Sequence, residues 1–332
     1  HFSPSTMTTT SDRSTAGTGT PEPWDENAAA GEHHSERSKC PDAIVDPSGG
    51  ASLGYHSAGS GTTWSAPQGL VLGWIHDFAA SGYGYAEVYR CSPSSPTEQS
   101  LCAKAYTGGA WGAELALETY TTNSVNAVLA SDGTGYGVLW RQHATSTDDY
   151  GVYYTTFTAT DAATPLQVSA ARGPYEDSLP PYTSPREAIA HDGTGYLLGW
   201  IQHDNPATTN REEVYAQRYT GVTPAARSAL LQRVHNGRAS TPTLTVNNSG
   251  VKLATWRQYY FENNTSSSAP TYRQGLFAAV QQNGAWGAPM LLSTFGTNAQ
   301  VVTNGSSFAI AYYSSSMQLA GRVYDNGLLS PQ

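Results

Sequence analysis

The chain has 332 residues, of which only 13% are charged, and it is rich in glycine (33) and tyrosine (21). Its net charge of −9, with 17 lysines and arginines in all, provides no basic surface, so neither nucleic acid nor an anionic membrane is an expected partner. No apolar run reaches the roughly 18 residues of a transmembrane helix.

Residues 1–49 differ in composition from the rest of the chain. They are mostly small polar residues with scattered charges, and they cannot bury enough apolar surface to fold alone. We therefore expect a disordered or extended polar leader at 1–49 and one domain at 50–332. The leader and its Cys40 are candidates for association with a cell surface.

Two cysteines indicate the compartment. Cys91 and Cys102 bracket a stretch rich in serine and proline that reads as a loop between two strands, and a disulfide there would close a short ring. Such a bridge is stable in an oxidising compartment, so it predicts a secreted or cell-surface protein. The alternative is a pair of buried free thiols in a cytosolic β-protein.

Beyond residue 50 the dominant feature is repetition. Residues 130–143 (ASDGTGYGVLWRQH) and 190–203 (AHDGTGYLLGWIQH) are nearly the same sequence, and weaker copies lie at 246–259, 69–76 and 305–312. The aromatic residues that anchor the copies recur at intervals of 56 to 66 residues. In chain order, these anchors are Trp74, Trp140, Trp200, Trp256 and Tyr312.

Each copy has the same internal order of elements. An apolar strand runs into a turn such as Asp-Gly, a second strand carries the anchor, and a tyrosine-rich third strand and a short fourth strand follow. Four antiparallel strands per copy predict an all-β protein that forms a five-bladed β-propeller, with the anchors packed between blades. A β-sandwich, or two stacked sandwiches, is the alternative.

One short segment adds a family resemblance. Residues 57–64 (SAGSGTTW) resemble the Asp-box hairpin of sialidase-like (BNR) propellers, Ser-x-Asp-x-Gly-x-Thr-Trp, with Gly59 in place of the aspartate. The resemblance implies a propeller of the kind found in exported bacterial repeat proteins. The Asp-box is a structural hairpin in that family, so it transfers no catalytic role. A sialidase site would also need three arginines, for which Arg172, Arg186 and Arg238 are candidates.

A ligand site is expected where the loops between second and third strands and the loops between blades emerge on one face. Aromatic rings together with histidine, arginine and carboxylate groups suit a sugar, which offers apolar ring faces and hydroxyls. The leading hypothesis is therefore non-catalytic binding of a carbohydrate or surface polymer. The candidate ligand-binding residues are His76, Asp77, His143, Tyr175, Arg186, His203, Asp204, Tyr259, Tyr260 and Glu262.

Two other functions use the same face. His76, His143 and His203 start equivalent loops and would suit copper or zinc, and Asp148 with Asp149 would suit a surface calcium ion. A glycoside hydrolase would need paired carboxylates at the inner ends of the first strands, expected near residues 50, 124, 185, 240 and 298. Glu187 is the clearest acid there. Because no pair is evident, we expect a binding protein rather than an enzyme.

Overall fold

The computed structural model describes residues 53–331 with gaps at 57–58, 61–62, 65–67, 73–74, 82–83, 92–99, 119–123, 144–149, 170–186, 204–211, 222, 230–238, 263–270, 315–317 and 326. At some strand positions only the backbone is described. These residues form strands and turns and contain no helix, as the composition predicts. None of them therefore forms a helix that is long and apolar enough to cross a membrane.

Five antiparallel sheets follow one another along the chain, and we number them sheet 1 to sheet 5. Sheet 1 comprises β5 (Ile75–Ser81), β6 (Gly84–Cys91), β7 (Ser100–Thr107), β8 (Ala110–Trp111) and β9 (Leu115–Ala116). Sheet 2 comprises β10 (Ser124–Ser131), β11 (Tyr136–His143), β12 (Tyr150–Phe157) and β13 (Leu166–Gln167). Sheet 3 comprises β14 (Glu187–His191), β15 (Tyr196–His203), β16 (Glu212–Thr220), β17 (Thr223–Pro224) and β18 (Ser228–Ala229).

Sheet 4 comprises β19 (Ala239–Val246), β20 (Lys252–Glu262), β21 (Thr271–Gln282), β22 (Ala285–Trp286) and β23 (Met290–Ser293). Sheet 5 comprises β24 (Thr297–Thr303), β25 (Phe308–Tyr313), β26 (Leu319–Asp325) and β27 (Leu328–Leu329). Before sheet 1, β1 (Leu53–His56) pairs with β4 (Gln68–Leu72), and β2 (Gly59–Ser60) forms a hairpin with β3 (Thr63–Trp64) at the Asp-box-like segment.

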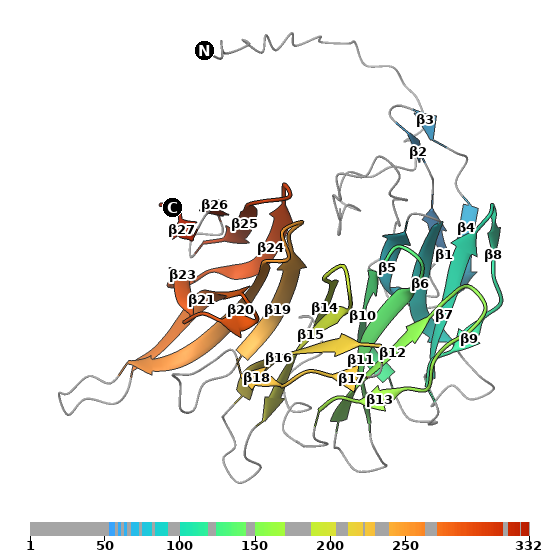
Figure 1. The fold of residues 1–332 in the computed structure, drawn as a ribbon, viewed down its shortest axis with the longest axis horizontal. Coiled ribbons are helices and arrows are strands. Elements are labelled where there is room, and N and C mark those ends of the chain that lie inside the picture. Colours follow the sequence, from blue (N-terminus) through green and yellow to red (C-terminus); the bar gives the residue numbers. More distant parts are fainter. Residues whose placement is uncertain are drawn as a thin grey trace, which may run out of the picture.

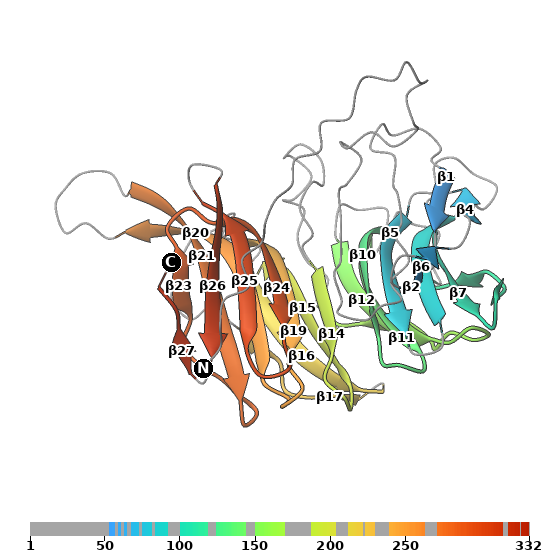
Figure 2. The same ribbon diagram turned by 90° about the horizontal axis from the view of Figure 1, so that it is seen from above.

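The sheets are arranged as the blades of a propeller. The first strand of each sheet lies beside the first strand of the next, in the order β5, β10, β14, β19 and β24, and these strands form the inner wall. The later strands of each sheet lie progressively farther out (Figures 1 and 2). The five predicted blades are therefore all present, and the chain does not fold as a two-layer sandwich.

The repeated residues are scaffold, as expected. Gly133 and Gly193 have positive φ angles of 95° and 90°, which the Asp-Gly hairpin turns require. Trp140 and Trp200 are buried, and each indole N–H donates to the side-chain oxygen of a glutamine two residues later, with Nε1–Oε1 distances of 3.1 and 3.3 Å. In these two copies the Trp-x-Gln sequence is therefore a packing element whose indole N–H is satisfied, whereas Nε1 of the buried Trp256 in the third copy has no hydrogen-bond partner.

The predicted anchor of the first blade is wrong. Trp74 itself lies outside the described residues, but the strand that follows it, β5, is an inner strand that pairs with β6 and not a second strand. The buried aromatic at the anchor position is Tyr89, which follows the buried Tyr85 by four residues as Trp140 follows Tyr136. Residues 85–89 belong to the second strand rather than the third, and the first inner strand begins at residue 75 rather than near 50.

Candidate functional site

The sheets have two unlike ends. Within each sheet the inner strand begins beside the end of the second strand, because the two are antiparallel: Ser124 pairs with Gln142, and Glu187 pairs with Trp200. We call this end the loop end, and the opposite end, with the tight hairpins, the turn end. Most of the ligand-binding residues predicted from the sequence belong to the loop end.

Three predicted site residues occupy equivalent backbone positions. His143 and His203 are the last residues of β11 and β15, and Tyr259 lies at the same point of β20, each three residues after the anchor tryptophan. The side chains of both histidines lie outside the described residues. A metal ion held by His76, His143 and His203 therefore stays a prediction.

His76 lies at the loop end but on a different kind of strand. It falls in a β-bulge of the inner strand β5, where the register shifts between Ile75 and Asp77. The inner strands β10, β19 and β24 shift register near the same end. Bulges re-aim side chains and are frequent beside functional sites.

Two bulges contain an asparagine in the left-handed region, with φ of 54° at Asn126 and 50° at Asn298. The sequence analysis did not identify these bulges. The signal that would have found them is the repeated Asn-Ala, 126–127 and 298–299, at the start of an inner strand, since asparagine tolerates positive φ better than most residues.

Asp77, a predicted ligand residue, has a structural task. Its Oδ1 accepts a hydrogen bond from the backbone N–H of Phe78 at 2.8 Å, and its Oδ2 accepts one from the N–H of Leu129 at 2.7 Å. Leu129 belongs to β10, so the carboxylate of Asp77 joins the inner strands of sheets 1 and 2.

A buried charge pair at the loop end joins sheets 2 and 3. Arg141 of β11 donates from Nε to Oε1 of Glu187 on β14 at 2.9 Å, and its NH2 lies 2.8 Å from the same oxygen. The side chains are 6% and 0% exposed, so this ion pair is buried. Glu187, the acid considered for hydrolysis, is thus held by a cation. The sequence analysis did not identify Arg141 as its partner.

A second cluster lies at the loop end of sheet 4. The guanidinium of Arg257 lies over the ring of Tyr259, with Cζ 5.0 Å from the ring centroid, and donates to the Tyr259 hydroxyl. The same NH2 donates to Oε1 of Gln274 on β21 at 2.7 Å. Nearby, between β23 and β24, the side chain of Phe295 is 47% exposed.

Sheet 4 also extends farther at this end than its neighbours. Tyr260, Phe261 and Glu262 continue β20 beyond the position where β11 and β15 end. They pair with residues 271–273 of β21, and the resulting ribbon projects from the sheet (Figure 2). The predicted residues Tyr260 and Glu262 thus lie on a ribbon that continues directly from the Arg257 cluster.

Sheet 1 holds an unusual acid away from the strand ends. Glu87 is fully buried and has no hydrogen-bond partner. Burial raises the pKa of Glu87 from 4.5 to about 7, and the positive charge of Lys104 opposes this only in part. A pKa near neutrality suits a general acid, but a fully buried carboxyl in mid-strand does not reach a substrate from solvent.

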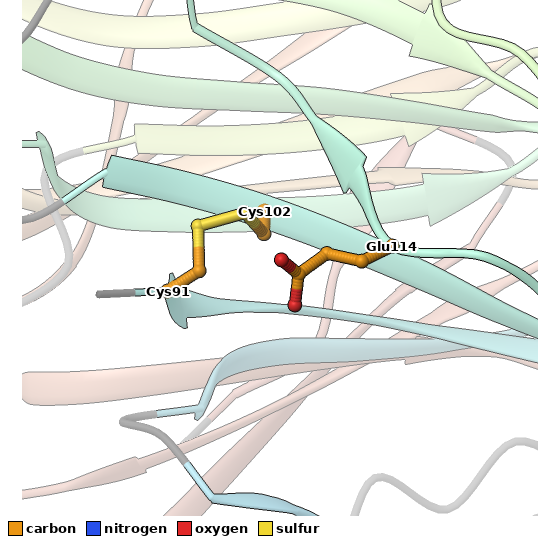
Figure 3. A group of neighbouring side chains, drawn as sticks. All are labelled: Cys91, Cys102 and Glu114. Atoms are coloured by element: carbon orange, nitrogen blue, oxygen red, sulfur yellow. A yellow bond between two sulfur atoms is a disulfide. The ribbon is translucent and has the colours of Figure 1, made fainter. Parts of the chain in front are cut away.

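The predicted disulfide between Cys91 and Cys102 is present, with the Cα atoms 5.6 Å apart. Glu114 lies beside it and accepts a 2.6 Å hydrogen bond from the hydroxyl of Tyr89 (Figure 3). Among the side chains that the structure describes, these three form the one group with enough potential metal donors. Both sulfurs are bonded to each other, so they are not thiolate ligands and the group is not a metal centre.

Several predicted residues are described only in part or not at all. Only the backbone is described at His76, Tyr260 and Glu262, as at His143 and His203. Nothing is described of Tyr175, Arg186, Asp204, the Asp148–Asp149 pair or Cys40.

No protein-family model matches the sequence, including any for the Asp-box family, and no curated protein matches it. Among solved structures, an α-L-arabinanase from Penicillium chrysogenum is 8% identical with a TM-score of 0.47, covering 75% of this chain and 77% of its own. The Aleuria aurantia lectin, a six-bladed propeller that recognises fucose, is 11% identical with a TM-score of 0.42, covering 87% and 89%. TolB from Acinetobacter baumannii is 9% identical with a TM-score of 0.37, covering 88% and 68%. At these values none of the likenesses supports an argument about function.

Proposed function

We propose that the protein binds a carbohydrate, or a polymer that contains sugars, at the loop end of the propeller without chemical conversion. The observation that carries this proposal is the cluster of Arg257, Tyr259 and Gln274 at the end of sheet 4, with the exposed Phe295 at the same end. Aromatic rings offer stacking surfaces to the apolar faces of sugars, and the guanidinium and amide groups offer hydrogen bonds to hydroxyls.

The cluster is organised before any ligand arrives. Arg257 restrains the Tyr259 ring from above and through its hydroxyl, while Gln274 fixes the guanidinium from the neighbouring strand. Because these side chains are already ordered, binding would cost less conformational entropy than ordering free side chains would. The ring of Tyr259 remains partly exposed, so it is within reach of a ligand.

We further propose that the protein acts outside the cytosol. The disulfide between Cys91 and Cys102 supports this, since such bonds persist mainly in oxidising compartments. Two buried acids are poor candidates for hydrolysis, because Glu187 is paired with Arg141 and Glu87 is inaccessible.

The proposal is tested by a glycan array followed by titration calorimetry on the best ligand. Tyr259→Ala should weaken binding about tenfold, which corresponds to the roughly 1.4 kcal/mol of one lost aromatic contact. Tyr259→Phe keeps the ring and should retain most of the affinity. Gln281→Ala at the turn end is the matched control and should bind like the natural protein. An array without ligands, an unaffected Tyr259→Ala variant, or turnover of a chromogenic glycoside would overturn the proposal.

A further inference from the structure

The face of sheet 5 that points away from sheet 4 is apolar but exposed to solvent. In sheet 1 the third-strand residues Leu101, Ala103 and Ala105 face sheet 2 and are fully buried in a shared core. In sheet 4, Leu276 and Ala278 are buried in the same way against sheet 5. In both sheets, the face that points toward the next sheet in the chain is buried against that sheet.

The corresponding positions of sheet 5 keep this apolar character. Leu276 pairs with the residue after the anchor of sheet 4, and Leu319 pairs with Tyr313, the residue after the anchor of sheet 5. Leu319 is nevertheless 73% exposed, Val323 is 45% exposed and Tyr313 is 41% exposed. Together with Ala309 and Ala311 on β25, they form a continuous apolar face on two paired strands. An exposed apolar surface of this kind on a soluble protein marks an interface.

The segment before sheet 1 has the backbone pattern of an outer half-blade. In sheet 1, Tyr106 pairs with Trp111 and Ala103 pairs with Leu115; in sheet 4, Gln281 pairs with Trp286 and Ala278 pairs with Met290. The N-terminal strands repeat both pairs at the same spacing, since Gly59 pairs with Trp64 and His56 pairs with Gln68. Strands β1 to β4 therefore correspond to the third and fourth strands of a blade.

This half-blade adjoins sheet 1 on the side opposite sheet 2. Only residues 73–74 separate β4 from β5, and both ribbon views place β1 and β4 next to sheet 1 (Figures 1 and 2). Side chains alternate along β6, so Tyr85, Glu87 and Tyr89 face away from Ala86 and Val88, which pack against sheet 2. All three are buried, and sheet 2 cannot cover them because it packs on the opposite face of sheet 1.

We propose that β1–β4 are the outer half of a sixth blade, which covers the apolar face of sheet 5 and closes the ring. The blade that precedes sheet 1 in the chain is also the one that follows sheet 5 around a ring, so one element covers both faces. The five predicted blades remain, and the closing blade is additional to them. Closure by contact between the first and last blades removes the exposed face that an open arc leaves.

Thiol labelling of the full-length chain tests this proposal. In a Cys40→Ser background, we would introduce Val323→Cys and Leu319→Cys on the proposed interface, with Ser306→Cys in an exposed turn as the control. Under native conditions a bulky maleimide should label the two interface thiols at least about tenfold more slowly than the control, because a covered thiol reacts only after local opening. In urea all three should react alike. Equal native rates in a monomer would overturn the proposal.

A second variant identifies what covers the face. Tyr55→Pro interrupts the ladder in which Tyr55 pairs with Gly69, and it should raise the labelling rate of Val323→Cys about tenfold, whereas Tyr55→Phe should not. Continued protection in Tyr55→Pro would show that another element covers the face. Protection that disappears on dilution, with a mass of two chains by light scattering, would assign the face to a second copy. Leu319→Cys gives an independent reading if the change at position 323 disturbs folding.

Discussion

Glu187→Gln provides the sharpest test of how the blades are held together. The substitution keeps the size of the side chain but removes its charge, and Arg141 loses its ion pair with Glu187 while only 6% of its side chain is exposed. Opposite charges about 4 Å apart contribute about 4 kcal/mol at the effective dielectric constant typical of proteins. Breaking one partner of a buried pair costs about 3–5 kcal/mol. We therefore expect the free energy of unfolding to fall by about 3 kcal/mol.

The measurement is a double-mutant cycle followed by thermal and urea unfolding. For a domain of this size, the loss should lower the melting temperature by roughly 6 °C. The variants Arg141→Met and Glu187→Leu should each be destabilising, whereas the double variant should recover most of the loss, because both buried charges of the pair are then removed together. Asp161→Asn, an exposed acid, is the control and should change stability by less than about 0.5 kcal/mol. Additive losses in the cycle would refute the assignment of this ion pair as the tie between sheets 2 and 3.

Replacing both Cys91 and Cys102 by serine should lower the free energy of unfolding by about 3 kcal/mol, because the disulfide closes a loop of sequence separation 11. A urea midpoint that does not change when reductant is added to the natural protein would contradict this. Glu87 has a pKa of about 7 in the folded protein against 4.5 for the free group. The contribution of this raised pKa to the free energy of unfolding is therefore present below pH 4.5 and is lost as the pH rises through 7. Glu87→Gln should therefore be more stable than the natural protein at pH 8 by roughly 3 kcal/mol, with no gain at pH 4 in urea titrations. For Asp192, burial acts to raise the pKa, but hydrogen bonds from Arg218, Thr194 and Lys252 outweigh it and hold the pKa well below its usual value. Asp192→Asn should therefore remove part of the stability loss seen as the pH falls below about 4, and identical acid unfolding curves would count against this.

The sequence predicted the sheets well because their register repeats in local patterns. The Asp-Gly or Asn-Ser-Gly turns and the Trp-x-Gln strands fix three second strands directly, since both signals act within about ten residues of chain. The first blade was misplaced because its anchor is Tyr89 rather than a tryptophan, and the nearest tryptophan, Trp74, precedes an inner strand. Counting the strands from the antiparallel pair of β5 and β6 would have identified the correct anchor.

The candidate site could be predicted only in part. The strand-end positions of His143, His203 and Tyr259 follow from the repeat, and the structure places their backbones at equivalent points. The ion pair of Arg141 with Glu187 joins residues 46 positions apart on different sheets, and no local pattern connects them. Pairings of this kind depend on how neighbouring blades face each other.

Polar side chains tie adjacent blades at both ends of the propeller, as Arg141 and Glu187 do at the loop end, but the hydrogen bonds of the Arg257 cluster stay within sheet 4. This difference supports the cluster as the ligand site. At the turn end, side chains tie adjacent blades: the Tyr136 hydroxyl donates to Ser81 at 3.1 Å, Lys252 lies 3.3 Å from Asp192, and Asn247 donates to the Ser306 carbonyl at 2.8 Å. Polar groups engaged in this way would have to break a blade contact to bind a ligand. At the loop end of sheet 4, the hydrogen bonds of the Arg257 NH2 group to Tyr259 and Gln274 lie within one blade, so a ligand can contact these side chains without breaking a contact between blades. Tyr259→Ala should accordingly weaken binding while leaving the melting temperature within about 2 °C of the natural protein.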